Sequence, residues 1–192
     1  RSTLFPYTTL FRSMTAPSLG GRSVLDALLQ PTRIYVKQVR AVLEQHPGAV
    51  HALAHITGGG ITENLNRVLP KHLDARVEVG SWEMEPIIPF VCAAARLTEG
   101  DALKTFNMGL GMILIVKPEA ADAVKASLEA QGETVYRVGT VVKGSGEVSY
   151  VNEEDLFPEL PSDREVPPAP VVPDPANRTT ERDTFYDEEA DE

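Results

Sequence analysis

The stretch His51-Ala-Leu-Ala-His-Ile-Thr-Gly-Gly-Gly-Ile-Thr-Glu-Asn-Leu65 decides the fold class of this chain. Residues 49–57 alternate with the two-residue period of a β-strand, and residues 61–69 read as a helix that ends at Pro70. Three consecutive glycines, Gly58–Gly60, stand between them. Glycine costs conformational entropy and offers no side chain to pack, so a triplet indicates that the backbone itself is used. The usual use at a strand–helix junction is to hold an anion on free N–H groups.

Strand-like and helix-like segments continue on both sides of this stretch. Upstream, residues 23–30 predict a short helix with Ser23 as its N-cap, and residues 32–45 predict an amphipathic helix after Pro31. Downstream we expect a strand at 76–79, helices at 86–97 and 101–105, a strand at 109–116, a helix at 118–131, and strands at 134–143 and 147–151. The prediction is an α/β (α+β) fold, with a mixed sheet covered by helices.

Two finer expectations concern the strands. The run at 109–116 is apolar without interruption, which indicates a central strand. The last two strands flank Gly144-Ser-Gly146, which is typical of a hairpin.

The charge of the chain is concentrated at one end. The 192 residues carry a net charge of −10, but residues 152–192 hold 14 acids, three arginines and seven prolines. The rest of the chain is close to neutral, so no basic field argues for nucleic acid. We expect 152–192 to be a disordered, acidic and proline-rich tail.

The first 13 residues show neither helical nor strand period. Residues 3–13 look like the in-frame translation of a common DNA-sequencing adaptor, so we expect 1–18 to be an artefactual or disordered leader. The domain is then expected to span 19–151, and the chain to be a fragment of a longer protein.

The cysteine and histidine residues limit the kinds of site that this chain can contain. The lone Cys92 excludes a disulfide within the chain, fits a reducing cytoplasm and is expected to be a small buried hydrophobe. No segment reaches the roughly 18 apolar residues of a membrane span. His51 and His55 lie about 13 Å apart along their strand, too far to share a metal ion without other ligands. We predict no metal site.

Candidate site residues gather around the glycine loop. Backbone N–H groups of Gly58, Gly59 and Gly60, with the hydroxyl of Thr57, are candidates for binding phosphate; the alternative is a tight turn with close packing. His55 adjoins the loop and is the candidate catalytic group, as a donor to phosphate or as an acid or base. The alternative for His55 is a hydrogen-bonded structural histidine.

Three further polar residues are candidates for the wall of a cleft. Asn64 is a poor helix former in the first turn, which indicates a polar contact. Arg33 offers a guanidinium fork for phosphate, or is an ordinary surface arginine. Asn107 stands at a strand entrance, where it also suits the cap of a turn.

Four segments carry a resemblance to a known family: Leu28-Leu-Gln-Pro-Thr-Arg-Ile-Tyr-Val-Lys37, Ala54-His-Ile-Thr-Gly-Gly-Gly-Ile-Thr-Glu-Asn64, Arg67-Val-Leu-Pro70 and Thr105-Phe-Asn-Met-Gly-Leu-Gly-Met112. In order and spacing they resemble aminoimidazole ribonucleotide synthetase, also called phosphoribosylformylglycinamidine cyclo-ligase. The resemblance covers roughly residues 19–151 and implies the C-terminal domain of that family.

The resemblance implies ATP-dependent closure of the imidazole ring of formylglycinamidine ribonucleotide in purine synthesis, with Mg²⁺ accompanying ATP. It also implies a cytoplasmic homodimer, and an N-terminal domain that carries most of the ATP and metal site. That domain is not found in these residues, so we expect the fragment to be inactive alone. Two alternatives stay open: a non-catalytic binding or dimerisation domain, and another ATP-dependent member of the same superfamily.

Overall fold

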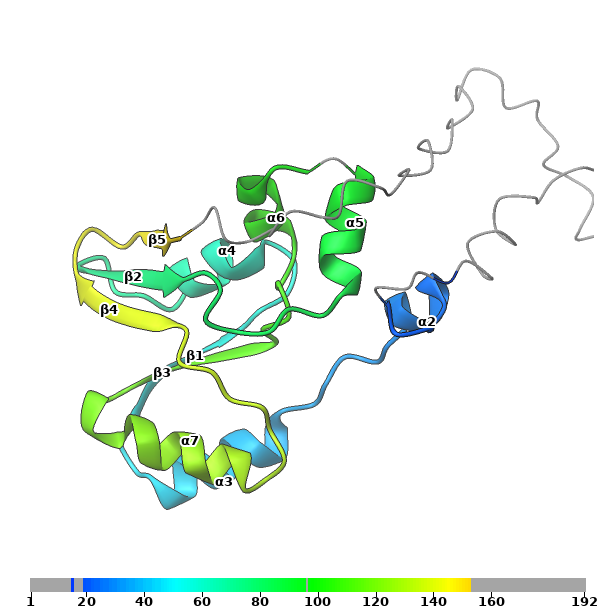
Figure 1. The fold of residues 1–192 in the computed structure, drawn as a ribbon. Coiled ribbons are helices and arrows are strands. Elements are labelled where there is room, and N and C mark those ends of the chain that lie inside the picture. Colours follow the sequence, from blue (N-terminus) through cyan, green and yellow to red (C-terminus); the bar gives the residue numbers. More distant parts are fainter. Residues whose placement is uncertain (1–14, 16–18, 96, 153–192) are drawn as a thin grey trace, which may run out of the picture.

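The computed structural model describes residues 15, 19–95 and 97–152, so the predicted leader and nearly all of the predicted tail lie outside the described residues. The described chain folds into two small sheets with helices packed on them (Figure 1). In order, its elements are α2 (Val24–Leu28), α3 (Val36–Gln45), β1 (Val50–His55), α4 (Gly60–Asn66), β2 (Leu73–Glu78), α5 (Ile87–Ala95), α6 (Glu99–Thr105), β3 (Met112–Val116), the 3-10 turn η2 (Pro118–Ala120), α7 (Ala121–Glu129), β4 (Gly139–Lys143) and β5 (Val148–Val151).

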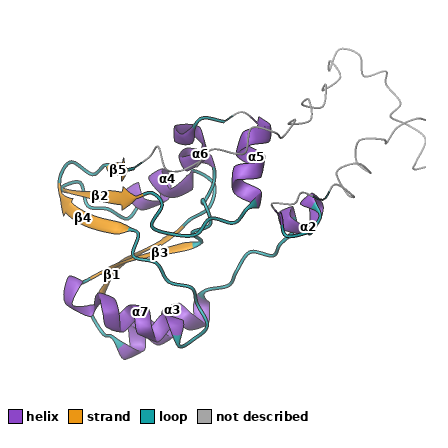
Figure 2. Ribbon diagram, in the orientation of Figure 1, coloured by secondary structure: helices purple, strands orange, loops and turns teal. Residues whose placement is uncertain are grey.

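The five strands form one two-stranded and one three-stranded sheet. β1 and β3 pair antiparallel, with Leu53 opposite Leu114 and a register shift between Val50 and Ala52. The other sheet has the order β4-β2-β5, in which β2 is antiparallel to β4 and parallel to β5 (Figure 2). The predicted mixed α/β class is therefore confirmed, with the strands divided between two sheets.

The hairpin predicted around Gly144–Gly146 is wrong, because β2 lies between β4 and β5. The carboxylate of Asp74, near the start of β2, explains the arrangement. Its Oδ1 accepts the backbone N–H groups of Ser145, Gly146 and Glu147 at 2.7, 2.9 and 2.8 Å. The Gly144–Gly146 turn therefore passes around β2, which lies between β4 and β5. The Asp74 carboxylate accepts the backbone N–H groups of the turn, which in a hairpin would be left to a partner strand.

The expectation of a central strand at 109–116 is also wrong, since β3 pairs only with β1 within the described part of the chain. Its uninterrupted apolar sequence has another cause. Ile113 and Ile115 pack into the main core, whereas Leu114 and Val116 pack against a second cluster formed with α3 and α7. Burial on both faces, and not a strand on each side, makes the sequence apolar throughout.

The helices follow the predicted order with shorter bounds, except α6, which begins at Glu99 and is longer than the predicted 101–105. Ser23 caps α2 as predicted, its Oγ accepting the N–H of Asp26 at 3.0 Å. α3 begins at Val36 and not at residue 32, which leaves residues 29–35 as an extended connection between α2 and the body (Figure 1). We call residues 29–35 the strap.

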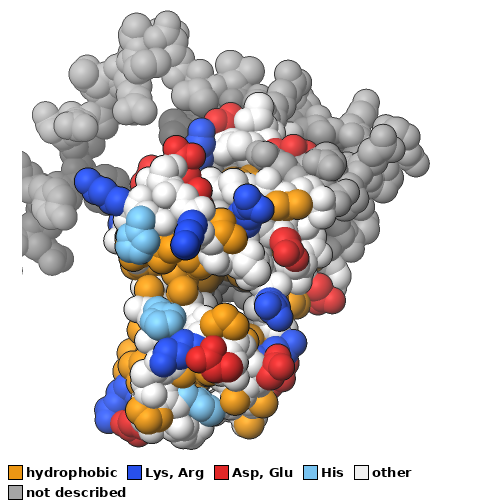
Figure 3. Space-filling model, turned by 90° about the vertical axis from the view of Figure 1, so that its left-hand side faces the viewer, with side chains coloured by type: hydrophobic (Ala, Val, Ile, Leu, Met, Phe, Trp, Pro, Cys, Tyr) orange, Lys and Arg blue, Asp and Glu red, His pale blue; other side chains and the backbone are white. Residues whose placement is uncertain are grey.

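The main core joins α4, β2, α5 and α6. Cys92 is 2% exposed within it, and burial raises the pKa of its thiol, so the prediction of a buried hydrophobe is confirmed. A broad hollow of about 1760 Å³ lies between the two halves of the molecule, lined in part by apolar residues of β3, α7 and β4. Figure 3 shows apolar side chains at the narrow region between these two halves. None of the helices in the described ranges is long and apolar enough to cross a bilayer.

Candidate functional site

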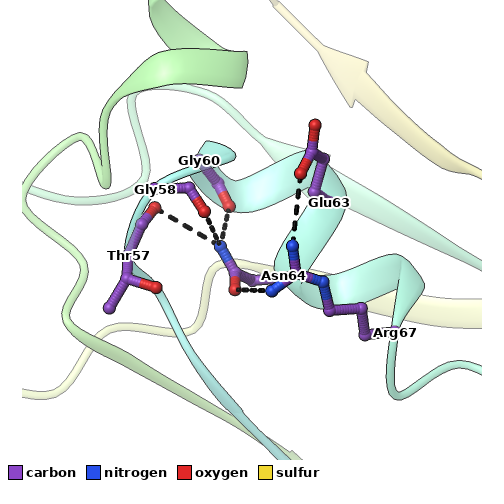
Figure 4. Close-up of polar contacts among 6 residues, drawn as sticks. All are labelled: Thr57, Gly58, Gly60, Glu63, Asn64 and Arg67. Carbon is purple, nitrogen blue, oxygen red and sulfur yellow. Dashed lines mark hydrogen bonds and ion pairs between the residues drawn. The ribbon is translucent and has the colours of Figure 1, made fainter.

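The glycine loop is organised by one buried side chain, Asn64 (Figure 4). Its Nδ2 donates to the carbonyl of Gly60 at 2.7 Å and to those of Thr57 and Gly58 at 3.3 Å. Its Oδ1 accepts from Nη1 of Arg67 at 3.3 Å. Asn64 is 5% exposed. It therefore makes the polar contact predicted for it, but as the support of the loop and not as an exposed group on a cleft wall.

The loop requires glycine where it meets α6. Gly60 has a φ of 62°, a conformation that favours glycine, and a Cβ there would run into the backbone carbonyl of Leu103. Gly58, by contrast, has open space around it and no positive φ. The tight-turn alternative is thus correct for Gly60, where α4 packs closely on α6, and leaves Gly58 free for another use.

The donors of the loop are partly unused. The N–H of Gly60 donates to the carbonyl of Thr57 at 3.0 Å, whereas those of Gly58 and Gly59 donate to no residue in the described ranges. The amide of Asn64 hydrogen-bonds three loop carbonyls, which therefore point toward the Asn64 side of the loop. Free N–H groups in such a loop attract anions. The carboxylate of Glu63 lies near Gly59, but it is paired with Arg67 at 3.3 Å, which offsets its charge.

A cavity of about 370 Å³ lies at the end of β1, with His55 and Ile56, the two residues before Thr57, in its wall. Arg33, His55 and Asn107 line it together, although they are far apart in sequence. Ile56 is also in its wall and connects the cavity to the loop along the chain. The structure thus brings three of the eight predicted site residues into one cavity. The other five, Thr57, Gly58, Gly59, Gly60 and Asn64, form the adjoining loop and its support.

Arg33 enters the cavity wall from the strap, already paired with a carboxylate. Its Nε lies 2.9 Å from Oε2 of Glu133, and its Nη2 lies 3.1 Å from Oε1. Nη2 also donates to the carbonyl of Gly132 at 3.2 Å. Arg33 is therefore neither a free fork nor an ordinary surface arginine, since its position is fixed from the end of α7.

Tyr35 is a site residue that the sequence interpretation missed, because an aromatic residue inside the amphipathic helix predicted at 32–45 is expected on its apolar face. Its ring lies edge-on to that of His55, with centroids 6.3 Å apart and planes at 68°. It lines the same cavity, and a Cβ on Gly111 would collide with its hydroxyl. Burial raises the pKa of Tyr35, and Glu133 raises it further while Arg33 lowers it, so the phenol is neutral near pH 7. The position of Tyr35 two residues after Arg33 is the sequence signal that could have identified it as a site residue.

Asn107 combines its two predicted roles. Its Oδ1 accepts the N–H of Gly109 at 3.1 Å, which caps the turn before β3. Trp82 Nε1 donates to the carbonyl of Met108 at 2.8 Å and fixes the same turn from the core. Asn107 remains part-exposed and lines the cavity, where its amide N–H groups are available as donors.

Two further charged residues, Arg22 and Glu85, line the cavity and pair with each other at 3.5 Å. Within residues 19–95 and 97–152, no group of three or more His, Cys, Asp or Glu side chains could hold a metal ion.

Comparison with known proteins places these features in context. The family model described as AIR synthase related protein, C-terminal domain, matches residues 8–152. It overlaps the expected domain 19–151, whose bounds stay a prediction. Phosphoribosylformylglycinamidine cyclo-ligase of Brevibacillus brevis (strain 47 / JCM 6285 / NBRC 100599) is 50% identical over 130 residues. That alignment covers 68% of this chain and 37% of the relative.

Two further proteins are similar. The bifunctional purine biosynthetic protein purD of Dictyostelium discoideum is 46% identical over 127 residues, which is 66% of this chain and 15% of the relative. The crystal structure of E. coli HypE, a hydrogenase maturation protein, matches with a TM-score of 0.49 and 22% identity, covering 66% of this chain and 39% of that one. The chain thus spans well under half the length of the curated relatives it matches.

Proposed function

Because the chain belongs to the AIR synthase related protein family, through that family's C-terminal domain, we propose that it is the substrate-holding part of an ATP-dependent cyclo-ligase. The match bears out the resemblance drawn from the four sequence segments. The proposed reaction closes the imidazole ring of formylglycinamidine ribonucleotide and gives aminoimidazole ribonucleotide in purine biosynthesis. We expect the 192 residues alone not to turn over substrate, and the whole enzyme to be a cytoplasmic homodimer.

The proposed reaction has two steps. First, the formyl amide oxygen takes the γ-phosphoryl group of ATP: an O–P bond forms, the bond to the β-phosphate breaks, and ADP leaves. Second, the amidine nitrogen attacks the same carbon, a C–N bond forms, the C–O bond breaks, and inorganic phosphate carries the oxygen away with release of a proton. Catalysis of this kind depends mainly on positioning and charge stabilisation, which fits a site built from hydrogen-bond donors.

One observation carries the proposal: the cavity that gathers Arg33, His55 and Asn107 adjoins a loop with unused backbone donors. We assign the substrate phosphate to the N–H groups of Gly58 and Gly59 and the exposed hydroxyl of Thr57, with Gly60 shaping the turn. Arg33 and Asn107 donate to the ligand from the cavity wall. His55, the last residue of β1, serves as a proton donor or as an acid/base group.

The described residues offer no fitting site for Mg²⁺. Its preferred ligands are carboxylate oxygens, and the described ranges hold no cluster of three or more candidate ligand side chains. We therefore assign ATP and Mg²⁺ mainly to residues that correspond to the rest of the longer relatives.

Calorimetric titration with two matched ligands tests the proposal. The full chain is titrated with formylglycinamidine ribonucleotide and with the corresponding ribonucleoside, which lacks the phosphate. We expect the ribonucleotide to bind at least about ten-fold more tightly, because charge-assisted hydrogen bonds to phosphate are lost in the ribonucleoside. Equal affinities, or no binding of either ligand by the folded chain, would contradict the assignment of the loop.

A second candidate function, a binding or dimerisation module, is favoured by exposed apolar side chains in and next to the strap. Leu29 and Ile34 are 68% and 77% exposed. Apolar side chains gathered on a surface mark interaction sites more often than chance. This candidate predicts a concentration-dependent dimer in sedimentation velocity together with indifference to phosphate-bearing ligands.

A further inference from the structure

The guanidinium of Arg33 is anchored along one edge. Nε and Nη2 face the two oxygens of Glu133 in a bidentate arrangement, and the second hydrogen of Nη2 reaches the carbonyl of Gly132. An arginine side chain has five N–H donors, of which three are used here. The two on Nη1 have no acceptor in the described part of the chain. Arg33 therefore has a fixed plane and two spare donors.

Glu133 is held in turn by the way α7 ends. The N–H of Gly132 donates to the carbonyl of Glu129 at 2.9 Å, and the N–H of Glu133 donates to that of Leu128 at 3.1 Å. With a φ of 83° at Gly132, this is a Schellman motif, which ends a helix and turns the following residue back over its last turn. The last residue of the motif, Glu133, thus supplies the carboxylate that meets Arg33 on the strap.

The burial of the two partners differs. The side chain of Glu133 is 11% exposed, whereas that of Arg33 is 54% exposed. The carboxylate is therefore the fixed support, and the guanidinium is the accessible group. The other ion pairs within the described helices, such as Lys125–Glu129 at 3.8 Å, have both partners 45–73% exposed and link neighbouring turns of one helix.

We infer that Glu133 is a positioning residue, which holds Arg33 at the cavity so that its remaining donors meet the anionic group of the ligand. The inference rests on the proposed function, in which Arg33 binds that ligand. An arginine held in place loses less side-chain entropy when the ligand arrives than a free one, so the support contributes to affinity without touching the ligand. The opposing possibility is that the carboxylate competes with the ligand for Arg33.

A double-mutant cycle separates these possibilities. Affinity for formylglycinamidine ribonucleotide is measured for the full chain, Arg33→Ala, Glu133→Gln and the double variant. We expect each single variant to bind about ten-fold more weakly than the unchanged chain, and the double variant to bind no more weakly than Arg33→Ala. Glu133→Gln keeps the shape and one acceptor, so the fold is preserved. Glu129→Gln, which alters the Lys125 pair four residues away, is the matched control and should bind as the unchanged chain does.

The Arg33 Nε–H resonance gives a second readout. It should be sharp and shifted from the free-arginine position in the unchanged chain and in Glu129→Gln, and should move to the free position in Glu133→Gln. Unchanged or tighter binding by Glu133→Gln, or an equal loss in the Arg33→Ala background, would overturn the inference while the proposed function stands. Absence of ligand binding by the unchanged chain, with the Arg33 signal still fixed, would overturn the proposed function and leave the pair a structural contact only.

Discussion

The amide of Asn64 donates to the carbonyl of Gly60 at 2.7 Å, the shortest of three hydrogen bonds by which this one side chain holds the glycine loop (Figure 4). Asn64→Ala leaves three carbonyls without this donor. We expect the free energy of unfolding to fall by about 1–3 kcal/mol, as for a buried hydrogen-bonding group whose partner is removed. Urea unfolding measures the change. Asn66→Ala, an exposed position on the same helix, is the control and should change stability by less than about 0.5 kcal/mol; equal effects would show that Asn64 is not the support.

A methyl group at Gly60 should be costly, whereas one at Gly58 should be tolerated. Gly60→Ala combines a φ of 62° with a collision against the Leu103 carbonyl, and we expect a loss of at least about 2 kcal/mol in the free energy of unfolding. Gly58→Ala meets nothing within 4 Å and should stay within about 0.5 kcal/mol of the unchanged chain. Thermal unfolding of both variants side by side tests the contrast, and a stable Gly60→Ala would refute the close approach of α4 to α6.

The hydroxyl of Tyr35 and the missing side chain of Gly111 depend on each other. Gly111→Ala places a Cβ on that hydroxyl, so we expect a loss of about 1–3 kcal/mol in stability, as for overpacking of a filled site. Tyr35→Phe removes the oxygen and should restore part of the loss when the two changes are combined. Strictly additive unfolding free energies would show that the two residues do not meet in solution.

Asp74 should make the stability of the β4-β2-β5 sheet sensitive to acid. Hydrogen bonds from the backbone of Glu147, Ser145 and Gly146 hold the pKa of Asp74 below its ordinary value, with Glu147 the largest cause. A carboxyl whose pKa is lower in the folded state stabilises the fold above its unfolded pKa of about 4, and this contribution is lost as the pH falls through the folded pKa.

The corresponding measurement compares Asp74→Asn with the unchanged chain in urea from pH 7 to pH 3. The unchanged chain should be the more stable at neutral pH, and the difference should shrink below about pH 4. Asp122→Asn, an exposed change in the first turn of α7, provides the control. A difference that stays constant down to pH 3 would exclude the turn contact as its source.

Much of the fold was predictable because its signals are local. The period of residues 49–57 and the capping serine of α2 each involve a few neighbouring residues, and the structure confirms them. The hairpin failed because the decisive contact, from Asp74 to the Gly144–Gly146 turn, joins residues about 70 positions apart. No local sequence pattern predicts that one strand will lie between two others in the sheet.

The candidate site was predictable to a similar degree. The glycine triplet predicted the loop, His55 was predicted because it adjoins that loop, and Asn107 because it stands at a strand entrance. The sequence could not identify Glu133, which meets Arg33 across 100 residues of sequence, because a carboxylate after a helix is ordinary until its partner is placed. Tyr35 was hidden for a different reason: an aromatic residue at helical spacing also satisfies an apolar face.

The central claim, that the glycine loop and the adjoining cavity hold a phosphate-bearing ribonucleotide, is tested most directly by backbone amide NMR. The full chain is titrated with formylglycinamidine ribonucleotide, and the Gly144–Gly146 turn serves as an internal comparison because Asp74 already occupies its donors. We expect saturable shifts of the Gly58 and Gly59 amides and of residues around His55 and Arg33, with no shift of the Gly144–Gly146 turn. A folded chain whose loop amides stay fixed, or whose shifts fall elsewhere, would contradict the claim.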